Sequence, residues 1–387
     1  MKKKIIILGS TGSVGVNTLK IIDKDKKNFE IFLLSANKNT KKLLKQAKKF
    51  KCKNVIVTDH KKFLQLTKKN KMKLNIFNSF DDLPGILKKK KIFYSMISIS
   101  GLDGLKPSIL LSKYTRNLAI VNKESLISGW HLINRSIKKN KVNFIPIDSE
   151  HYCIFNLLKN YSPDDVDKLY ITASGGPFLN FPKKSFKKIT PKIALSHPNW
   201  KMGKKISIDS ATMMNKVFEV IEARNIFNIS YDKISILTHP KSYIHAIIKF
   251  KNGLIKIIAH DPDMKIPIQN SLYENNNFMY KTKKLNINLL NNLNLKSVDL
   301  KKFPVVKLLN KIPKNNSLYE TVLITINDLL VDKFLNKKIN FIQLNQLIIK
   351  FACLKFFDKF KVLKADKIDK IYNLRKYVSL KINSLGI

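Results

Sequence analysis

The sequence predicts an α/β protein with three parts: a Rossmann-like, doubly wound N-terminal domain, an α+β catalytic domain and a small C-terminal helical bundle. Up to about residue 150, short apolar strands alternate with helices, which is typical of a parallel sheet. A glycine-rich turn at residues 9–15 follows the first strand directly. From residue 301 onward, apolar residues recur at helical spacing, which predicts packed helices. A chain of 387 residues is also too long for one hydrophobic core.

The first domain, at residues 1–150, contains most of the expected parallel strands. Helices are expected to begin near Gly15 and Thr40. Each strand is a short apolar run bounded by polar or turn-forming residues. The expected strands are residues 4–8, 29–35, 54–58, 95–99, 118–121 and 144–146.

The remaining chain divides into a catalytic domain at residues 151–285, a linker at 286–300 and a helical domain at 301–387. The catalytic domain mixes helices with strands, which we expect at residues 168–172, 234–237, 246–250 and 255–259. The Asn-rich stretch at residues 275–294 has little hydrophobic periodicity, which is typical of a linker. The C-terminal helices are expected at residues 305–310, 318–335, 341–357 and 367–382.

Charge and cysteine content limit the possible function classes. The 73 Lys and Arg residues outnumber the 27 Asp and Glu residues, and the formal net charge is +46. The lysines lie along the whole chain together with an excess of Asn and Ile, so we attribute them to compositional bias and expect no specific nucleic-acid partner. No apolar run reaches the length of a membrane span, and we expect no membrane partner. Three widely spaced cysteines favour a reducing compartment, the cytoplasm.

The turn at residues 9–15, with glycines at 9, 12 and 15, predicts a dinucleotide site. Its glycines would let backbone amides approach a pyrophosphate at a helix N-terminus. The second strand is followed by Asn37, Lys38 and Asn39, and no acid is present to hold a ribose 2′-hydroxyl. A lysine there favours the 2′-phosphate of NADPH, although in so lysine-rich a chain Lys38 could also be background.

Two groups of acids predict a divalent metal site. Asp148 and Glu150 follow an apolar strand, at the sheet edge where α/β proteins bind ligands, and paired carboxylates suit a hard cation. The alternative for these two is a helix cap followed by a surface acid. On a helix starting near Ser210, Asn215, Lys216 and Glu219 share one face. Glu219 could complete the metal site, whereas spacing alone favours an ordinary ion pair with Lys216.

Two loops complete the candidate site. Residues 172–178 offer Ser174 and several backbone amides to a phosphate, although turn formation alone would explain this sequence. Residues 197–205 place His197, Trp200 and Gly203 in a loop, which predicts a flap that excludes water. A lone histidine is more often structural, so His197 gains weight from its neighbours.

Taken together, these motifs resemble one family closely, the 1-deoxy-D-xylulose 5-phosphate reductoisomerases. The matching segments occur in the same order as in the family, over about residues 5 to 270. The match at residues 197–224 is too long to arise by chance. The matching segments are residues 9–15, 122–125, 146–151, 172–178, 197–216, 219–224 and 262–264.

The resemblance implies a reaction and a set of site residues. A metal-held 1-deoxy-D-xylulose 5-phosphate would be isomerised and then reduced by NADPH to 2-C-methyl-D-erythritol 4-phosphate, within a homodimer. The Mg²⁺ or Mn²⁺ ligands would be Asp148, Glu150 and Glu219, and these would act in catalysis with Lys123 and His197. The substrate would contact Lys123, Ser149, Glu150, Ser174, His197, Trp200, Ser210, Asn215, Lys216 and Glu219. NADPH would contact Thr11, Gly12, Ser13, Val14, Asn37, Lys38, Asn39, Asn122, Glu124 and Gly203.

Several positions depart from the family pattern. Asn37, Leu179 and His260 stand where the family usually has Gly, Arg and Gly, and residues 324–328 also differ.

Two other functions are alternatives. Another NADPH dehydrogenase, such as a homoserine or semialdehyde dehydrogenase, would need no Asp-Ser-Glu metal site. A basic nucleic-acid-binding protein would bind DNA with a steep salt dependence and have no metal-dependent turnover.

Overall fold

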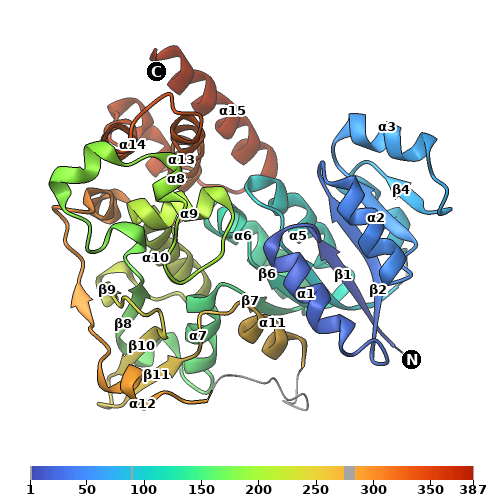
Figure 1. Cartoon of the computed structure of the whole chain (residues 1–387), viewed down its shortest axis with the longest axis horizontal. Coiled ribbons are helices and arrows are strands. Elements are labelled where there is room, and N and C mark those ends of the chain that lie inside the picture. Colours follow the sequence, from blue (N-terminus) through green and yellow to red (C-terminus); the bar gives the residue numbers. More distant parts are fainter. Residues whose placement is uncertain (1, 89, 274–283, 387) are drawn as a thin grey trace. The chain divides into compact units, whose positions relative to one another are not determined.

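The computed structural model describes residues 2–88, 90–273 and 284–386 (Figure 1). They form two compact units. The first comprises the described residues of 1–125, 131–148 and 264–280, and the second those of 126–130, 149–263 and 281–387. Among the described residues, no helix has the length and apolar character needed to cross a bilayer.

The first unit is built on a seven-stranded sheet in the order β4-β3-β2-β1-β5-β6-β7. All its pairings are parallel, which confirms the predicted Rossmann-like fold. The strands are β1 (Lys3–Leu8), β2 (Phe29–Ala36), β3 (Asn54–Val57), β4 (Asn75–Phe77), β5 (Ile92–Ile97), β6 (Thr115–Ile120) and β7 (Asn143–Pro146). The strand order reverses between β1 and β5, and α/β proteins bind ligands at such a reversal.

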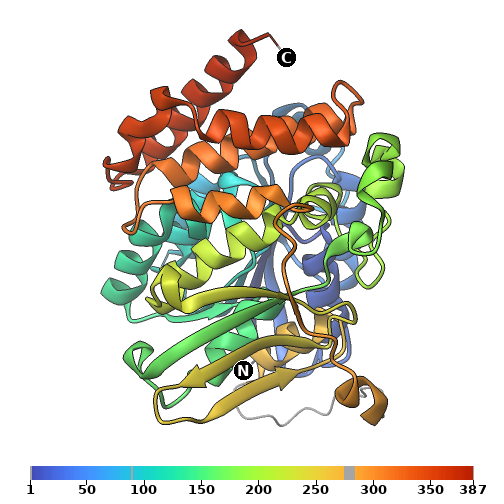
Figure 2. The same ribbon diagram turned by 90° about the vertical axis from the view of Figure 1, so that its left-hand side faces the viewer.

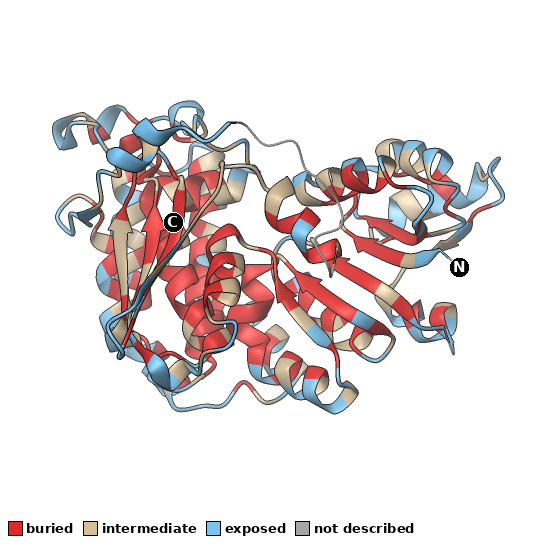
Figure 3. Ribbon diagram, turned by 90° about the horizontal axis from the view of Figure 1, so that it is seen from below, coloured by how far each residue is buried: buried red, intermediate tan, exposed pale blue. Residues whose placement is uncertain are grey.

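The helices of this unit connect successive strands. They are α1 (Ser13–Asp23), α2 (Thr40–Lys49), α3 (His60–Lys68), α4 (Leu83–Leu87), α5 (Leu105–Leu111) and α6 (Lys123–Asn140). The central strand β1 is fully buried from Ile5 to Leu8, because both faces of a parallel sheet are covered by helices. Figure 3 shows this burial along the strands.

Helix α11 (Lys265–Leu272) also belongs to the first unit, although its residues fall within the catalytic domain that we expected. It packs against α1. The Tyr94 and Ser271 hydroxyls are hydrogen-bonded at 2.7 Å, and the Tyr273 hydroxyl donates to Asp25 at 2.9 Å. These contacts join segments that are far apart in the sequence, so composition and periodicity gave no sign of them.

The second unit contains a five-stranded sheet in the order β11-β10-β8-β9-β12. Strands β8 and β9 are parallel, and the other pairings are antiparallel. The strands are β8 (Val166–Ala173), β9 (Ile234–Thr238), β10 (Ile244–Phe250), β11 (Ile255–Ala259) and β12 (Lys296–Ser297). One face carries an apolar core that includes Ile154, Leu169, Val220 and Ile248.

The helices of the second unit form two groups. The first group is α7 (Ser149–Leu157), α8 (Pro191–Ala194), α9 (Lys204–Thr212) and α10 (Met214–Phe227). The C-terminal group is α13 (Tyr319–Leu335), α14 (Phe341–Ala352) and α15 (Ile368–Ser384). Figure 2 shows α10 between the sheet and the C-terminal helices. The predicted helix at residues 305–310 is instead a 3₁₀ segment, Pro304–Lys311. The helix predicted at residues 341–357 ends at Ala352, and a 3₁₀ segment follows at Lys355–Lys361.

Within the expected linker, residues 286–300 contain regular structure. Helix α12 (Ile287–Asn291) is followed by β12, which pairs with the end of β9. The part of the Asn-rich stretch at residues 275–283 lies outside the described residues.

Candidate active site

The glycine-rich turn forms at the carboxyl end of β1. Gly9 has φ +79°, and a Cβ there would lie 2.4 Å from the Ser98 carbonyl oxygen, so no larger residue fits. Helix α1 starts at Ser13 with Gly12 as its N-cap and no side-chain cap. Its first amides therefore face outward at the positive end of an eleven-residue helix, which is suited to an anion such as a pyrophosphate.

The end of β2 lies beside this turn, because the Ser35 hydroxyl accepts a 2.9 Å hydrogen bond from the Gly9 amide. Asn37, Lys38 and Asn39 are exposed. Asn39 caps α2 by accepting from the Lys42 amide at 3.2 Å, so it has a structural role whether or not it contacts a cofactor.

Lys42 was missed by the sequence interpretation. Its ammonium donates to the Thr11 carbonyl oxygen at 2.9 Å, which brings a positive charge to the turn expected to hold the pyrophosphate. Among so many lysines, no sequence signal distinguishes this one.

The N-terminus of α6 is fixed by Asn122. Its carboxamide oxygen accepts from the Ser125 amide at 2.7 Å, and its NH₂ group donates to the carbonyl oxygens of Ile99 and Gly101. This arrangement connects the loop after β5 to α6 and buries the next two residues, Lys123 and Glu124. Lys123 forms an ion pair with Asp148.

The predicted metal ligands are brought together. Asp148 lies after β7 and directly before Ser149, the first residue of α7. Asp148 and Glu150 are therefore both at the start of that helix. Glu219 lies in α10. One carboxylate oxygen from each of Asp148, Glu150 and Glu219 lies within 4.8 Å of the other two. Three converging hard oxygen donors on buried or half-buried side chains fit Mg²⁺ or Mn²⁺.

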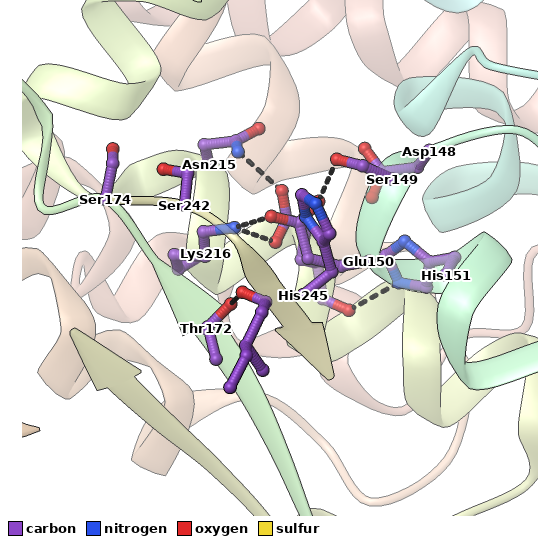
Figure 4. A network of polar contacts seen from close by, with 12 residues as sticks. Asp148, Ser149, Glu150, His151, Thr172, Ser174, Asn215, Lys216, Ser242 and His245 are labelled. Atoms are coloured by element: carbon purple, nitrogen blue, oxygen red, sulfur yellow. Dashed lines mark hydrogen bonds and ion pairs between the residues drawn. The ribbon is translucent and has the colours of Figure 1, made fainter. Parts of the chain in front are cut away.

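Polar neighbours hold these carboxylates in place (Figure 4). Lys216 donates to Glu150 Oε1 at 2.8 Å and to Glu219 Oε2 at 2.5 Å. Ser149 donates to Glu150 Oε2 at 2.6 Å, and Asn215 donates to Glu219 Oε1 at 2.5 Å. The surface ion pair offered as the alternative for Lys216 is therefore wrong, because Lys216 is buried and bridges two acids.

His151 lies within the motif at residues 146–151, and its role could not be predicted from the sequence. It is fully buried, and its Nε2 is 3.0 Å from the Glu219 carbonyl oxygen, while its Nδ1 is 3.7 Å from Glu222 Oε1. His151 thus connects α7 to α10, the two helices that carry Glu150 and Glu219. Its place directly after Glu150 was the only available signal.

Ser174 and His197 form a second polar pair. His197 Nδ1 accepts from the amides of Asn199 and Trp200 at 3.1 and 3.0 Å, so Nε2 carries the proton and donates to the Ser174 hydroxyl at 3.0 Å. Burial first, and then the charge of Lys216, lowers the pKa of His197 to about 4. His197 is therefore neutral near pH 7.

The Ser174 loop packs closely on α9. Gly176 has φ +63°, and a Cβ there would lie 2.8 Å from the Ser210 carbonyl oxygen. The Ser174 hydroxyl also accepts from the Gly176 amide at 3.0 Å. Since it accepts from both Gly176 and His197, its own proton is directed to a further acceptor, as phosphate binding requires.

The predicted flap is hydrogen-bonded to the loop between β9 and β10. Asn199 donates to the Pro240 carbonyl oxygen at 2.7 Å and to the Ser242 hydroxyl at 2.9 Å. The Trp200 ring meets His245 edge to face at 6.2 Å between centroids. Ser242 and His245 were not predicted, because an isolated serine or histidine near a strand carries no signal. Gly203 is the N-cap of α9.

Comparison with known proteins identifies related sequences over the whole chain. The family model described as 1-deoxy-D-xylulose 5-phosphate reductoisomerase matches residues 5–129. Two models of the C-terminal domain of that enzyme match residues 144–227 and 260–378. A protein of this name from Pelagibacter ubique is 54% identical over 387 residues and covers 100% of both chains. One from Clostridium tetani is 36% identical and covers 97% of each chain.

Solved structures agree with the sequence matches. The enzyme from Zymomonas mobilis in complex with NADPH has a TM-score of 0.88 at 29% identity and covers 100% of this chain and 99% of its own. A DOX-P reductoisomerase in complex with NADPH, fosmidomycin and magnesium has a TM-score of 0.89 at 28% identity and covers 99% of this chain and 98% of its own. The sequence motifs and the comparisons over the whole chain therefore indicate the same group of proteins.

Proposed function

The chain belongs to the 1-deoxy-D-xylulose 5-phosphate reductoisomerase family, and we propose that Asp148, Glu150 and Glu219 hold the divalent metal of its reaction. The enzyme uses NADPH and a divalent metal to convert 1-deoxy-D-xylulose 5-phosphate to 2-C-methyl-D-erythritol 4-phosphate, a step of non-mevalonate isoprenoid precursor biosynthesis. The observation that supports this metal site best is the convergence of three carboxylate oxygens within 4.8 Å.

The bound metal supplies Lewis acidity to the carbonyl and the adjacent hydroxyl oxygen of the substrate. The carboxylates would hold the metal, and neighbouring hydrogen-bonding side chains would orient the substrate oxygens toward it. Lys123, buried beside Asp148, is positioned to donate to a substrate oxygen. The Ser149 hydroxyl donates its one proton to Glu150 at 2.6 Å, so it can accept a hydrogen bond from a substrate hydroxyl.

The substrate phosphate is bound, in this proposal, by Ser174, His197, Ser210, Asn215 and Lys216. The packing of the Ser174 loop on α9 at Ser210 supports this assignment, as does the proton that Ser174 has for an outside acceptor. Since phosphate is remote from the reacting carbons, its binding energy serves to orient them. His197 donates as a neutral group, because its pKa is lowered to about 4.

NADPH is assigned to the first unit. Thr11, Gly12, Ser13 and Val14 lie at the N-terminus of α1, where the pyrophosphate would be held. The exposed Asn37, Lys38 and Asn39 would contact the adenosine ribose, and Asn122 and Glu124 belong to the same site. Gly203 is assigned to the cofactor by resemblance alone. The domain division, with NADPH at residues 1–150, the metal and substrate at 151–285 and helices at 301–387, is part of the proposal.

Trp200 is proposed as the flap residue that covers the substrate and excludes water before hydride transfer. Its backbone bond to His197 and its ring contact with His245 support a position over the phosphate-binding loop. Closure over the aldehyde intermediate would protect it from side reactions.

We also propose a cytoplasmic homodimer that accepts Mn²⁺ as well as Mg²⁺. Strand β11 is at the edge of its sheet, and Leu254, Ile255 and Ile257 are 52%, 60% and 48% exposed. An exposed apolar edge strand is a surface that another chain can cover. Light scattering tests the dimer, since Ile257→Lys should convert it to a monomer, and cell fractionation tests the location.

The metal assignment is tested by measuring Mn²⁺ binding to the wild type, Asp148→Asn and Glu219→Gln. Binding should weaken at least about tenfold in each variant, because each loses one charged ligand. Equal affinity in all three proteins would reject the site.

A further inference from the structure

Every carboxylate oxygen of Glu150 and Glu219 already has a hydrogen-bond donor. Lys216 and Ser149 share the two oxygens of Glu150, while Lys216 and Asn215 share those of Glu219. Each carboxylate oxygen can accept more than one partner, but a cation that binds both side chains meets the positive charge of Lys216, which already contacts both. Lys216 is the one residue among these donors that contacts both, so its departure alone would release an oxygen of each glutamate.

The charges point to the same residue. The Lys216 and Glu219 side chains are 8% and 1% exposed, so their interaction is little screened by water. The three carboxylates carry −3, whereas Lys123 and Lys216 together carry +2. Only one net negative charge then attracts a divalent ion. Removal of the Lys216 ammonium from the carboxylates restores a second.

Lys216 also has a second group of partners to move toward. Its positive charge lowers the pKa of His197, so its field reaches the loop in which His197 donates to Ser174. Figure 4 shows the Lys216 ammonium directed at Glu150, with Ser174 drawn in the same network. A lysine has a flexible four-carbon stem and three rotatable donors, and a phosphate beside Ser174 would offer it a stronger anion.

We propose that Lys216 competes with the metal for Glu150 and Glu219 and moves from these carboxylates to the substrate phosphate, so that phosphate and metal binding promote each other. The exchange is possible because one ammonium neutralises either set of anions but not both. This inference rests on the proposed metal site and adds a coupling between the metal and phosphate subsites. By linkage, a group that opposes metal binding until phosphate arrives makes the two ligands cooperative.

The test is the affinity of the full-length protein for Mn²⁺ alone, measured by the electron paramagnetic resonance signal of the free ion. Lys216→Met should bind Mn²⁺ about tenfold more tightly than the wild type, within the usual range of coupling between sites. Lys216→Arg, which keeps the positive charge beside the carboxylates, should not bind Mn²⁺ more tightly than the wild type. An affinity of Lys216→Met equal to or weaker than that of the wild type would overturn the inference.

Lys205→Met is the matched control. Lys205 pairs with Asp209 and Asp328 at 3.1 Å each, so this variant loses the same charge beside a different pair of acids. Its Mn²⁺ affinity should equal that of the wild type. If it also binds about tenfold more tightly, the effect of Lys216→Met reflects net charge alone, and the competition is rejected.

Two further measurements separate the possible failures. Glu219→Gln should lose Mn²⁺ affinity, and if it does not, the proposed metal site is wrong, whatever Lys216→Met does. If Lys216→Met is poorly folded without metal, the melting temperature gives the answer, because added Mn²⁺ should raise it more in this variant than in the wild type. An equal or smaller rise would contradict the inference.

Discussion

Trp200→Ala tests whether the flap tryptophan acts on bound substrate or merely stabilises the fold. Trp200 is only half-buried, and its ring contacts His245 edge to face at 6.2 Å, an interaction of about 0.5–1.5 kcal/mol. Its hydrogen bond to His197 comes from the backbone amide and survives the substitution. We therefore expect a loss of about 1 kcal/mol, or roughly 2 °C in melting temperature, together with a sharp fall in kcat.

The other tryptophan provides the comparison. Trp130 is 8% exposed in α6, and its truncation to alanine should cost about 3–5 kcal/mol, as for a core aromatic residue. Calorimetry and steady-state rates on both variants separate the two roles. A drop in melting temperature for Trp200→Ala as large as that for Trp130→Ala, or an unchanged kcat, would refute the flap assignment.

Three other outcomes are expected. Asp148→Asn or Glu219→Gln should abolish metal-dependent turnover while NADPH still binds, as measured by nucleotide fluorescence; an equal loss of both would mean that the ligands share one site. NADPH should be strongly preferred over NADH, since Lys38 and no acid follows β2; comparable kcat/KM with both cofactors would contradict this. Burial raises the pKa of Glu320 from 4.5 to about 7. As pH rises, Glu320 therefore loses its proton in the unfolded protein before it does so in the folded protein. The stability of the folded protein falls between pH 4.5 and pH 7 as a result. Glu320→Gln should therefore gain up to about 3 kcal/mol relative to the wild type between pH 4.5 and pH 8; urea unfolding at the two pH values checks this, and a constant difference would refute it.

The N-terminal fold and the pair of acids at Asp148 and Glu150 were predictable from local sequence. Strand β1 and its glycine turn are adjacent in the chain, and Gly9 is required by its φ of +79°, so residue type alone signals the conformation. Asp148 and Glu150 likewise lie two residues apart after a strand. Glu219 was only a possible third ligand from its helix face, and the family resemblance selected it, because α7 and α10 are far apart in sequence.

Contacts between distant segments could not be predicted. Lys42, in α2, donates a hydrogen bond to the Thr11 carbonyl oxygen in the turn after β1. No sequence pattern distinguishes this lysine from the many others, so the contact could not be predicted. His260, which stands where the family usually has glycine, stacks on His245 at 3.9 Å between ring centroids. That contact depends on the register of β10 against β11, which hydrophobic alternation does not specify at a strand end.

The most direct test of the central claim is NADPH oxidation by the purified protein with 1-deoxy-D-xylulose 5-phosphate, followed by absorbance with and without Mg²⁺. The account predicts consumption of NADPH that requires both the sugar phosphate and the metal, with 2-C-methyl-D-erythritol 4-phosphate as the product, and no such turnover in Glu219→Gln. A folded protein that binds NADPH and Mg²⁺ but does not consume NADPH with this substrate would contradict it.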